Sequence, residues 1–341
     1  MILILSTAMV DSTTELVIDW IERLGGEWVR LNGQDLRGGR LRLDIDGDGA
    51  DFVIDLDGAE LRPADVGAVW FRRWLTPREW TADDFEPDPA FASAARDHVR
   101  GEIRALGDAV FSLFRGVPWL SDPDTATINK LRVLAAAAEV GLRVPRTRVA
   151  NRRADLAAFV EEAGRAITKS LSEGAVFTGG DGQYGLYTAE LTAASLEVAP
   201  DVVFPAFVQE HVEKAFEVRS FYLDGRFRSM AIFSQRDPTT AVDFRRYNQA
   251  RPNRRVPYRL PVEVAGRARD LMTELGLTTG SLDFVVSREG EHVFLEVNPV
   301  GQFQMVSYPC NYRLERDVAA FLVAADAGRP DSARRCAAPS P

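Results

Sequence analysis

Several chemically versatile residue types are scarce in this sequence. Its 341 residues include two cysteines and three histidines, and only three of its 41 basic residues are lysines. The two cysteines, Cys310 and Cys336, indicate neither a disulfide framework nor a Cys-based zinc site. The net charge of −9 lacks the basic excess that general nucleic-acid binding needs, so we expect no nucleic-acid partner.

Long apolar runs are also missing. No segment reaches the roughly 18–20 apolar residues that a membrane-spanning helix needs. The opening run at residues 2–6 (ILILS) is too short for the core of a signal peptide, and no basic residue precedes it. We therefore expect a cytoplasmic protein without a membrane partner, and its 46% of hydrophobic residues is enough for two or three packed units.

The order of the predicted elements indicates an α/β fold. Residues 2–6 predict a strand, and Ser12 with Glu15 fits an S-x-x-E capping box at the start of a helix. A strand at 28–31 completes a β-α-β opening, which is typical of a parallel sheet. The other expected elements are a hairpin at 40–60, helices at 92–114, 129–140 and 261–275, and strands at 68–71, 166–169, 203–211, 218–223, 230–233, 281–287 and 292–297.

Two expected strands near the C-terminus carry carboxylates in apolar surroundings. Asp283 lies in LDFVV, and Glu296 and Asn298 lie two residues apart in FLEVN, so they share a strand face. A lone buried carboxylate costs several kcal/mol unless it is paired or binds a metal. Oxygen ligands of this kind suit Mg²⁺, which also takes water and nucleotide phosphates. The spacing leaves open the alternative of a solvated sheet face.

The rare lysines differ in their settings. Lys130 lies at the start of an expected helix, and Lys169 ends a short strand before the glycine-rich stretch 172–185. Ammonium groups in these two places could hold phosphate oxygens, although ordinary surface lysines are the alternative. Lys214 has no such setting, and we expect it on the surface. For 172–185 we favour a plain loop over a flap that covers phosphates.

The stretch around residue 210 changes abruptly from apolar to polar. The segment 209–212 (Gln209, Glu210, His211 and Val212) could form a hinge that offers a purine a dry slot and edge hydrogen bonds. We expect the side chain of His211 to have its hydrogen bonds satisfied within the structure and not to act as a base. Glu217 could accept from ribose hydroxyls, and Arg219 shares its strand face. A salt bridge between Glu217 and Arg219 is the alternative.

Two pairs of adjacent arginines are candidates for holding anions. Arg245 and Arg246 follow Asp243, and such a cluster can clamp a phosphoryl group. Arg72 and Arg73 lie between two tryptophans and could form a binding wall. Both pairs could instead be solvated charge clusters.

Taken in order, these segments resemble the ATP-grasp superfamily over roughly residues 120–325. More narrowly, the opening ILILS…DSTTELVIDWIERLG…RLN and the stretch LEVNPVGQFQMVSYPCNY resemble the grasp-with-spasm peptide maturases, which are graspetide (microviridin-type) macrocyclases. The long glycine-rich loop is a departure from the family pattern.

The resemblance implies an ATP-grasp fold, in which two α+β lobes clasp ATP, preceded by an α/β pre-ATP-grasp domain. The implied division is 1–118 for the pre-ATP-grasp domain, 119–205 for the central lobe, 206–327 for the C-terminal lobe and 328–341 for a flexible tail. For the nucleotide, the implied roles are phosphate contacts by Lys130 and Lys169, adenine contacts by Gln209, Glu210, His211 and Val212, and a ribose contact by Glu217. Arg219 and Arg245 would contact phosphoryl oxygens, and magnesium would be bound by Asp283, Glu296 and Asn298, of which Asn298 would also lie close to the nucleotide. Acidic side chains of the substrate would be bound by Arg72, Arg73 and Arg246.

The function that this resemblance implies is an ATP- and Mg²⁺-dependent ligase. It would macrocyclise a ribosomally made precursor peptide by joining Asp or Glu to Thr, Ser or Lys through an acyl phosphate. Two alternatives stay open: a ligase that adds an amino acid to a small carboxylic acid or a protein tail, and a catalytically silent nucleotide-binding module. The expected partner is the precursor peptide, and a homodimer is left open.

Overall fold

The computed structural model describes residues 1–7, 11–35, 40–47, 49–56, 58–72, 74, 92–171, 176–179, 182–185, 188–235 and 252–328. The chain divides into two compact units. The first unit comprises Met1–Ala126, Gln302–Ser307 and Arg313–Pro341, and the second comprises Thr127–Gly301 and Tyr308–Tyr312. The finer boundaries implied by the resemblance stay predictions. No helix among the described residues is both long and apolar enough to span a bilayer.

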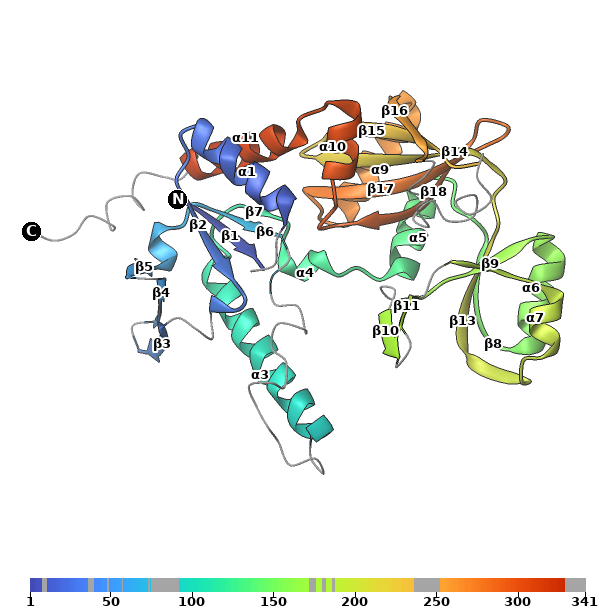
Figure 1. Cartoon of the computed structure of the whole chain (residues 1–341), viewed down its shortest axis with the longest axis horizontal. Coiled ribbons are helices and arrows are strands. Elements are labelled where there is room, and N and C mark those ends of the chain that lie inside the picture. The colour runs from blue at the N-terminus through green and yellow to red at the C-terminus, as the bar shows by residue number, and fades with distance from the viewer. Residues whose placement is uncertain are drawn as a thin grey trace, which may run out of the picture. The chain divides into compact units, whose positions relative to one another are not determined.

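A parallel sheet forms the centre of the first unit. Its strand order is β2-β1-β6-β7, and β1 is buried along its whole length, as its unbroken apolar run requires. Helices α1 and α11 lie side by side and α11 contacts β1 and β6 (Figure 1). The bounds are β1 Ile2–Ser6, α1 Ser12–Arg23, β2 Trp28–Asn32, β6 Ala68–Phe71, β7 Trp119–Leu120 and α11 Leu314–Ala327.

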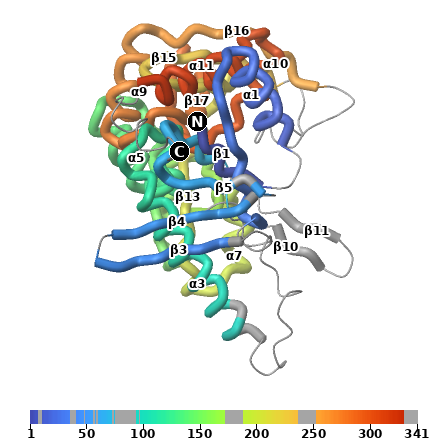
Figure 2. The backbone as a smooth tube through the Cα atoms, turned by 90° about the vertical axis from the view of Figure 1, so that its left-hand side faces the viewer, coloured from blue at the N-terminus to red at the C-terminus, as the bar shows by residue number. Residues whose placement is uncertain are grey.

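A small antiparallel sheet and a long helix complete this unit. Strands β3 and β4 form a hairpin, which Figure 2 shows as two strands side by side, and β5 pairs with β4. Their inward side chains Phe52 and Ile54 join Leu3, Leu5 and Val110 in one core. The bounds are β3 Arg40–Asp46, β4 Gly49–Leu56, β5 Ala59–Leu61, η1 Pro63–Asp65, α3 Ala92–Leu113 and α4 Pro123–Ala126.

The start of α1 differs from the predicted capping box. The N-cap is Asp11, whose Oδ1 accepts from the backbone N–H of Thr13 at 3.1 Å. Ser12 is already the first helical residue and its Oγ donates to Gln304 Oε1, while Glu15 accepts from Arg30. Asp and Ser are equally good caps, and here the acid one position earlier takes the role.

The second unit contains a four-stranded sheet covered by two helices. Its order is β12-β9-β13-β8, and α6 packs on β8, β9 and β13 and on α7 (Figure 1). Leu156 and Phe159 of α6 pack against Ala166, Leu196 and Val208. The bounds are β8 Thr147–Arg152, α6 Arg153–Ala163, β9 Ala166–Thr168, β12 Ala189–Leu191, α7 Ala193–Glu197 and β13 Val202–Glu210.

A five-stranded antiparallel sheet forms the rest of this unit. Its order is β16-β15-β14-β17-β18, and one face packs on α5 and α9 through an apolar core that includes Val218, Leu282 and Phe284. The residues between these, including Arg219 and Asp283, face the other way. The bounds are α5 Lys130–Glu139, β14 Lys214–Leu223, β15 Arg226–Phe233, β16 Arg254–Tyr258, α9 Val262–Glu274, β17 Thr279–Ser287 and β18 His292–Asn298. Helix α10 (Gln304–Cys310) is divided between the two units.

The glycine-rich stretch is the main error in the predicted elements. In place of a plain loop, β10 (Val176–Gly179) and β11 (Gly182–Gly185) pair as an antiparallel hairpin. Glycine is unfavourable in strands, so this stretch carries no strand signal. Helices α4, α6, α7, α10 and α11 and strands β7, β8, β12 and β16 were not predicted. The other predicted elements are confirmed within a few residues, and 329–341 lie outside the described residues.

Candidate functional site

A row of charged side chains crosses three neighbouring strands of the five-stranded sheet. Arg219 on β14 pairs in register with Asp283 on β17, which pairs with Glu296 on β18. Arg219 Nη1 donates to both carboxylate oxygens of Asp283, at 3.1 and 2.9 Å. Asn298 Nδ2 donates to Asp283 Oδ2 at 3.3 Å. The side chains of Asp283 and Glu296 are only 13% and 22% exposed, which excludes the alternative of a solvated sheet face.

A β-bulge decides which side chains of β18 face this row. Asp283 pairs with Glu296 but Phe284 pairs with Phe294, so Leu295 is an extra residue in β18. In a regular strand Phe294 and Glu296 would share a face. The extra residue instead lets Phe294 enter the apolar core while Glu296 and Asn298 face Asp283. The bulge therefore reconciles an apolar strand with a polar site at its end.

Two of the three lysines lie beside the row. Lys169 Nζ is 3.8 Å from Glu296 Oε2 and 5.5 Å from the centre of the Phe207 ring. Lys130 Nζ donates to the carbonyl of Ser170 at 3.1 Å, which brings it next to the residue that follows Lys169. The Lys130 position is fixed because Asn129 caps α5 through its side-chain oxygen. The ammonium groups of Lys130 and Lys169, both predicted to contact phosphates, thus lie close to the end of β9.

The predicted hinge is fixed by two neighbouring segments. The backbone N–H of Glu210 donates to Arg146 O at 2.9 Å, and that of His211 donates to Arg165 O at 3.0 Å. Arg146 Nε also donates to Glu210 Oε2 at 2.7 Å. Gln209 is 1% exposed and donates to Thr147, so its side chain serves the structure. Gln209 and Glu210 end β13, and His211 and Val212 follow directly.

A buried group of side chains surrounds Glu217. Lys214 Nζ donates to Glu217 Oε1 at 2.6 Å, and Ser234 Oγ donates to Glu217 Oε2 at 2.6 Å. Lys214 is 8% exposed, so our expectation of a surface lysine is wrong. Glu217 and Arg219 pair with Lys214 and Asp283 and not with each other. Sequence reasoning missed Lys214 and Ser234, although the scarcity of lysine was a signal for the first.

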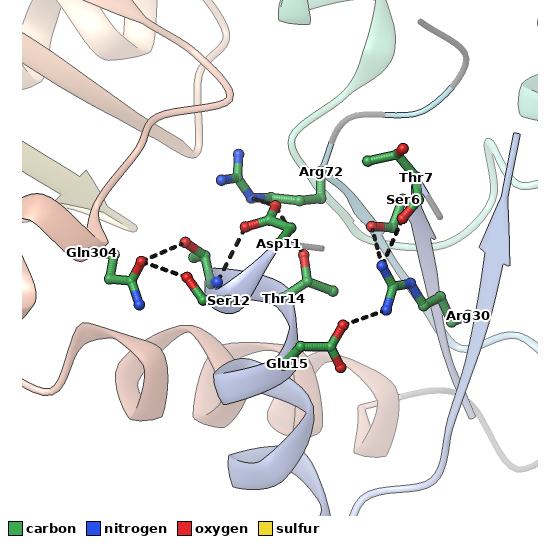
Figure 3. A network of polar contacts seen from close by, with 10 residues as sticks. Ser6, Thr7, Asp11, Ser12, Thr14, Glu15, Arg30, Arg72 and Gln304 are labelled. Atoms are coloured by element: carbon green, nitrogen blue, oxygen red, sulfur yellow. Dashed lines mark hydrogen bonds and ion pairs between the residues drawn. The ribbon is translucent and has the colours of Figure 1, made fainter. Parts of the chain in front are cut away.

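The arginine pairs are only partly described. Arg72 is 2% exposed, and its Nε is 3.2 Å from Asp11 Oδ2 at the end of the parallel sheet (Figure 3). Nearby, Arg30 donates to Thr7 O at 2.7 Å and to Glu15 at 2.6 Å. Arg72 is thus an internal ion-pair partner, not a solvated charge. Arg73, Arg245 and Arg246 lie outside the described residues.

Comparison with known proteins gives structural matches only. No protein-family model and no curated protein matches the sequence. A Chryseobacterium gregarium RiPP-associated ATP-grasp ligase, solved with ADP and a leader and core peptide, matches with a TM-score of 0.83, 21% identity, and 94% and 96% coverage of this chain and of that chain. The macrocyclase MdnC of Microcystis aeruginosa MRC, solved with its precursor peptide MdnA, matches with a TM-score of 0.77, 24% identity, and 95% and 99% coverage.

A third match is the ATP-grasp ligase PsnB, solved with a minimal precursor, Mg and ADP. Its TM-score is 0.75, with 20% identity and coverage of 95% of this chain and 97% of that chain. The chain has the ATP-grasp fold. The fold class that the resemblance implied is therefore confirmed over nearly the whole chain, including the preceding α/β domain.

The row of side chains in this ATP-grasp fold fits a magnesium ion in its donor chemistry. Two carboxylates, Asp283 and Glu296, lie in register on adjacent strands, and Mg²⁺ commonly takes one or two protein carboxylates. Among the described residues no three Asp, Glu, His or Cys side chains come together, so Asn298 would supply the third oxygen. A rotation about χ2 would exchange Nδ2 for Oδ1.

Two histidines make the unfolding free energy depend on pH. Burial is the largest effect that lowers the pKa of His211, aided by the positive charge of Arg165, and burial also lowers the pKa of His292. A lowered pKa means that the unfolded chain takes up protons first, so we expect the unfolding free energy to fall as the pH drops below about 6.5. Urea unfolding between pH 8 and 5 checks this.

The contribution of His211 is isolated by a matched substitution. His211→Gln should reduce the loss of unfolding free energy on acidification, and His98→Gln, which removes an exposed imidazole on α3, is the matched control. An unchanged pH dependence in His211→Gln would show that the imidazole titrates alike in the folded and unfolded chain.

Proposed function

We propose that the chain is an ATP-dependent carboxylate–amine or carboxylate–alcohol ligase that macrocyclises a precursor peptide in the cytoplasm. The observation that carries the proposal is the row Arg219–Asp283–Glu296 with Lys169 beside it, on one face of the sheet. Two adjacent carboxylates lie there between two cations, an arrangement that suits a metal nucleotide. The peptide ligases that share the fold over more than nine tenths of both chains support the choice of a peptide substrate.

The chain's own residues would bind and orient the nucleotide. The carbonyl of Glu210 and the N–H of Val212 would meet the adenine edge, and Glu217 would accept from the ribose. Lys130 and Lys169 would hold phosphate oxygens. Asp283, Glu296 and Asn298 would hold Mg²⁺, which would offset the negative charge of the phosphate oxygens.

The reaction needs positioning and charge neutralisation more than a protein nucleophile. The γ-phosphoryl group of ATP passes to an Asp or Glu carboxylate of the peptide, giving an acyl phosphate and ADP, and a hydroxyl or amine then attacks the acyl carbon and releases phosphate. Arg219 and Arg245 would neutralise the oxygens that carry charge in both steps. The reaction therefore needs neither a reactive cysteine nor a Ser-His pair.

The peptide's acidic side chains require cationic partners. We propose Arg73 and Arg246 for this contact, on the basis of the sequence. Arg72 is buried against Asp11 and would anchor the segment to which the next residue, Arg73, belongs. The charge of these groups suits an acidic core peptide, which Coulombic attraction would bring to the site.

Incubation with a precursor peptide tests the proposal. The best candidate is a short peptide encoded beside this chain that repeats Thr with Glu or Asp. With ATP and Mg²⁺, we expect the peptide to lose the mass of one water per ring while one ADP forms per ring. Mass gains that match an added amino acid would favour the amino-acid ligase instead. No peptide- or amino-acid-dependent ADP release would favour the silent module.

A further inference from the structure

The ion pair between Lys214 and Glu217 lies inside the protein. The two residues are 8% and 5% exposed, and Ser234, which donates to the second carboxylate oxygen, is 0% exposed. Desolvation makes such a pair a weak source of stability, and an apolar pair of similar size is often as stable. Its retention beside the site therefore calls for a role other than holding the sheet together.

A β-bulge in β14 places Lys214 next to Glu217. Lys214 pairs with Ser287 and Phe216 pairs with Val286, so Ala215 is an extra residue in β14. In a regular strand Lys214 would face away from Glu217, because residues three apart lie on opposite faces. The bulge turns Lys214 to the face that Glu217 and Arg219 share, while Phe216 stays against the apolar core.

The hydrogen bonds fix the direction in which Glu217 can accept. Gln235 Nε2 donates to Ser234 Oγ at 3.1 Å, so the hydroxyl hydrogen of Ser234 is directed to Glu217 Oε2. Lys214 holds Oε1 in the same way. A carboxylate has about four lone-pair sites, two on each oxygen. After these two bonds, each oxygen retains a site, and the two sites are held in a fixed relative position.

We infer that Lys214 and Ser234 are positioning residues that hold Glu217 for two neighbouring hydroxyl groups, and that they make the enzyme select ribonucleotides over 2′-deoxyribonucleotides. The inference rests on the proposed function, in which Glu217 meets the ribose. A 2′-deoxyribose supplies one hydroxyl, so one oxygen of the desolvated carboxylate loses its donor. A hydrogen bond to a charged group is worth enough to give a preference of roughly 10- to 100-fold.

Calorimetry with ADP and 2′-deoxy-ADP, each with MgCl₂, measures this preference on the full chain. We expect the wild type to bind ADP roughly 10- to 100-fold more tightly than 2′-deoxy-ADP. Ser234→Ala and Lys214→Met should weaken ADP binding more than 2′-deoxy-ADP binding, so that the ratio falls to within about 3-fold. Lys214→Arg, which keeps a cationic donor, should retain a larger ratio than Lys214→Met.

Two further variants separate positioning from a loss of structure. Lys214→Met leaves the charge of Glu217 buried without its cation, and this variant could fail to fold for that reason alone. The double variant Lys214→Met/Glu217→Gln removes both charges and replaces the single variant in the binding measurement if the single variant does not fold. Its ratio should also be within about 3-fold. Ser229→Ala is the matched control, because Ser229 is a buried serine on β15, the strand that Ser234 directly follows, and it bonds to Ser220 and not to Glu217. It should leave the ratio unchanged.

The outcomes distinguish this inference from the proposed function. Equal affinity of the wild type for the two nucleotides, or an equal weakening of both in Ser234→Ala and Lys214→Met, would overturn the inference while nucleotide binding itself still supports the ligase. A wild type that binds neither nucleotide would overturn both.

Discussion

Glu296→Gln should lower the ATP-dependent cyclisation of the precursor by at least about 100-fold while leaving the fold intact. The amide keeps the size of the carboxylate but removes the negative charge that Asp283 and Glu296 together offer to Mg²⁺. It also removes the anion that lies 3.8 Å from Lys169 Nζ. Mass spectrometry of the peptide and ADP release measure the loss, and circular dichroism measures the fold.

A matched control lies close by in the chain. Glu291 precedes β18, and its exposed side chain pairs with Arg143 at 3.2 Å. Glu291→Gln makes the same chemical change outside the row, so it should leave turnover within about 2-fold, as surface substitutions usually do. Near-normal cyclisation by Glu296→Gln would remove Glu296 from the metal site and with it the assignment of Asp283 and Asn298.

The polar end of β18 could be predicted from the sequence because it does not cross the bulge. Glu296 and Asn298 are two apart in a regular segment, so strand periodicity places them on one face correctly. The same periodicity would put Phe294 beside them, whereas the extra residue Leu295 sends it into the core. A bulge arises from how two strands pair, and no pattern within one strand reveals it.

The environment of Lys214 was missed for the same reason. Its strand face depends on the bulge at Ala215, which brings it to Glu217 of the same strand. The other partner of Glu217, Ser234, directly follows the neighbouring strand β15. Likewise, the sequence offered Glu217 and Arg219 as each other's partners, since they share a face. Instead, the bulge within β14 brings Lys214 to Glu217, and the neighbouring strand β17 supplies Asp283 for Arg219. Side-chain pairing across a sheet is a property of register, which becomes known only with the fold.

Replacing the pair Arg219 and Asp283 should separate stability from activity. Arg219→Met leaves the Asp283 carboxylate, whose side chain is 13% exposed, without its guanidinium, and we expect it to cost about 3 kcal/mol of unfolding free energy. The double variant Arg219→Met/Asp283→Leu replaces both charges by apolar groups of similar size, and such replacements are often neutral or stabilising. Urea unfolding should therefore show that the second substitution recovers most of the loss.

We expect turnover to behave in the opposite way, because the proposed function requires these charges at the nucleotide. Arg219→Met should lower cyclisation by about 100-fold or more, and the double variant should be no more active despite its recovered stability. This pattern separates a row of residues built for phosphoryl transfer from one that only holds β14 to β17. A double variant that regains both stability and cyclisation would show that the Arg219–Asp283 pair serves the sheet alone, since neither a cation for the phosphoryl oxygens nor a metal ligand would then be required at these two positions.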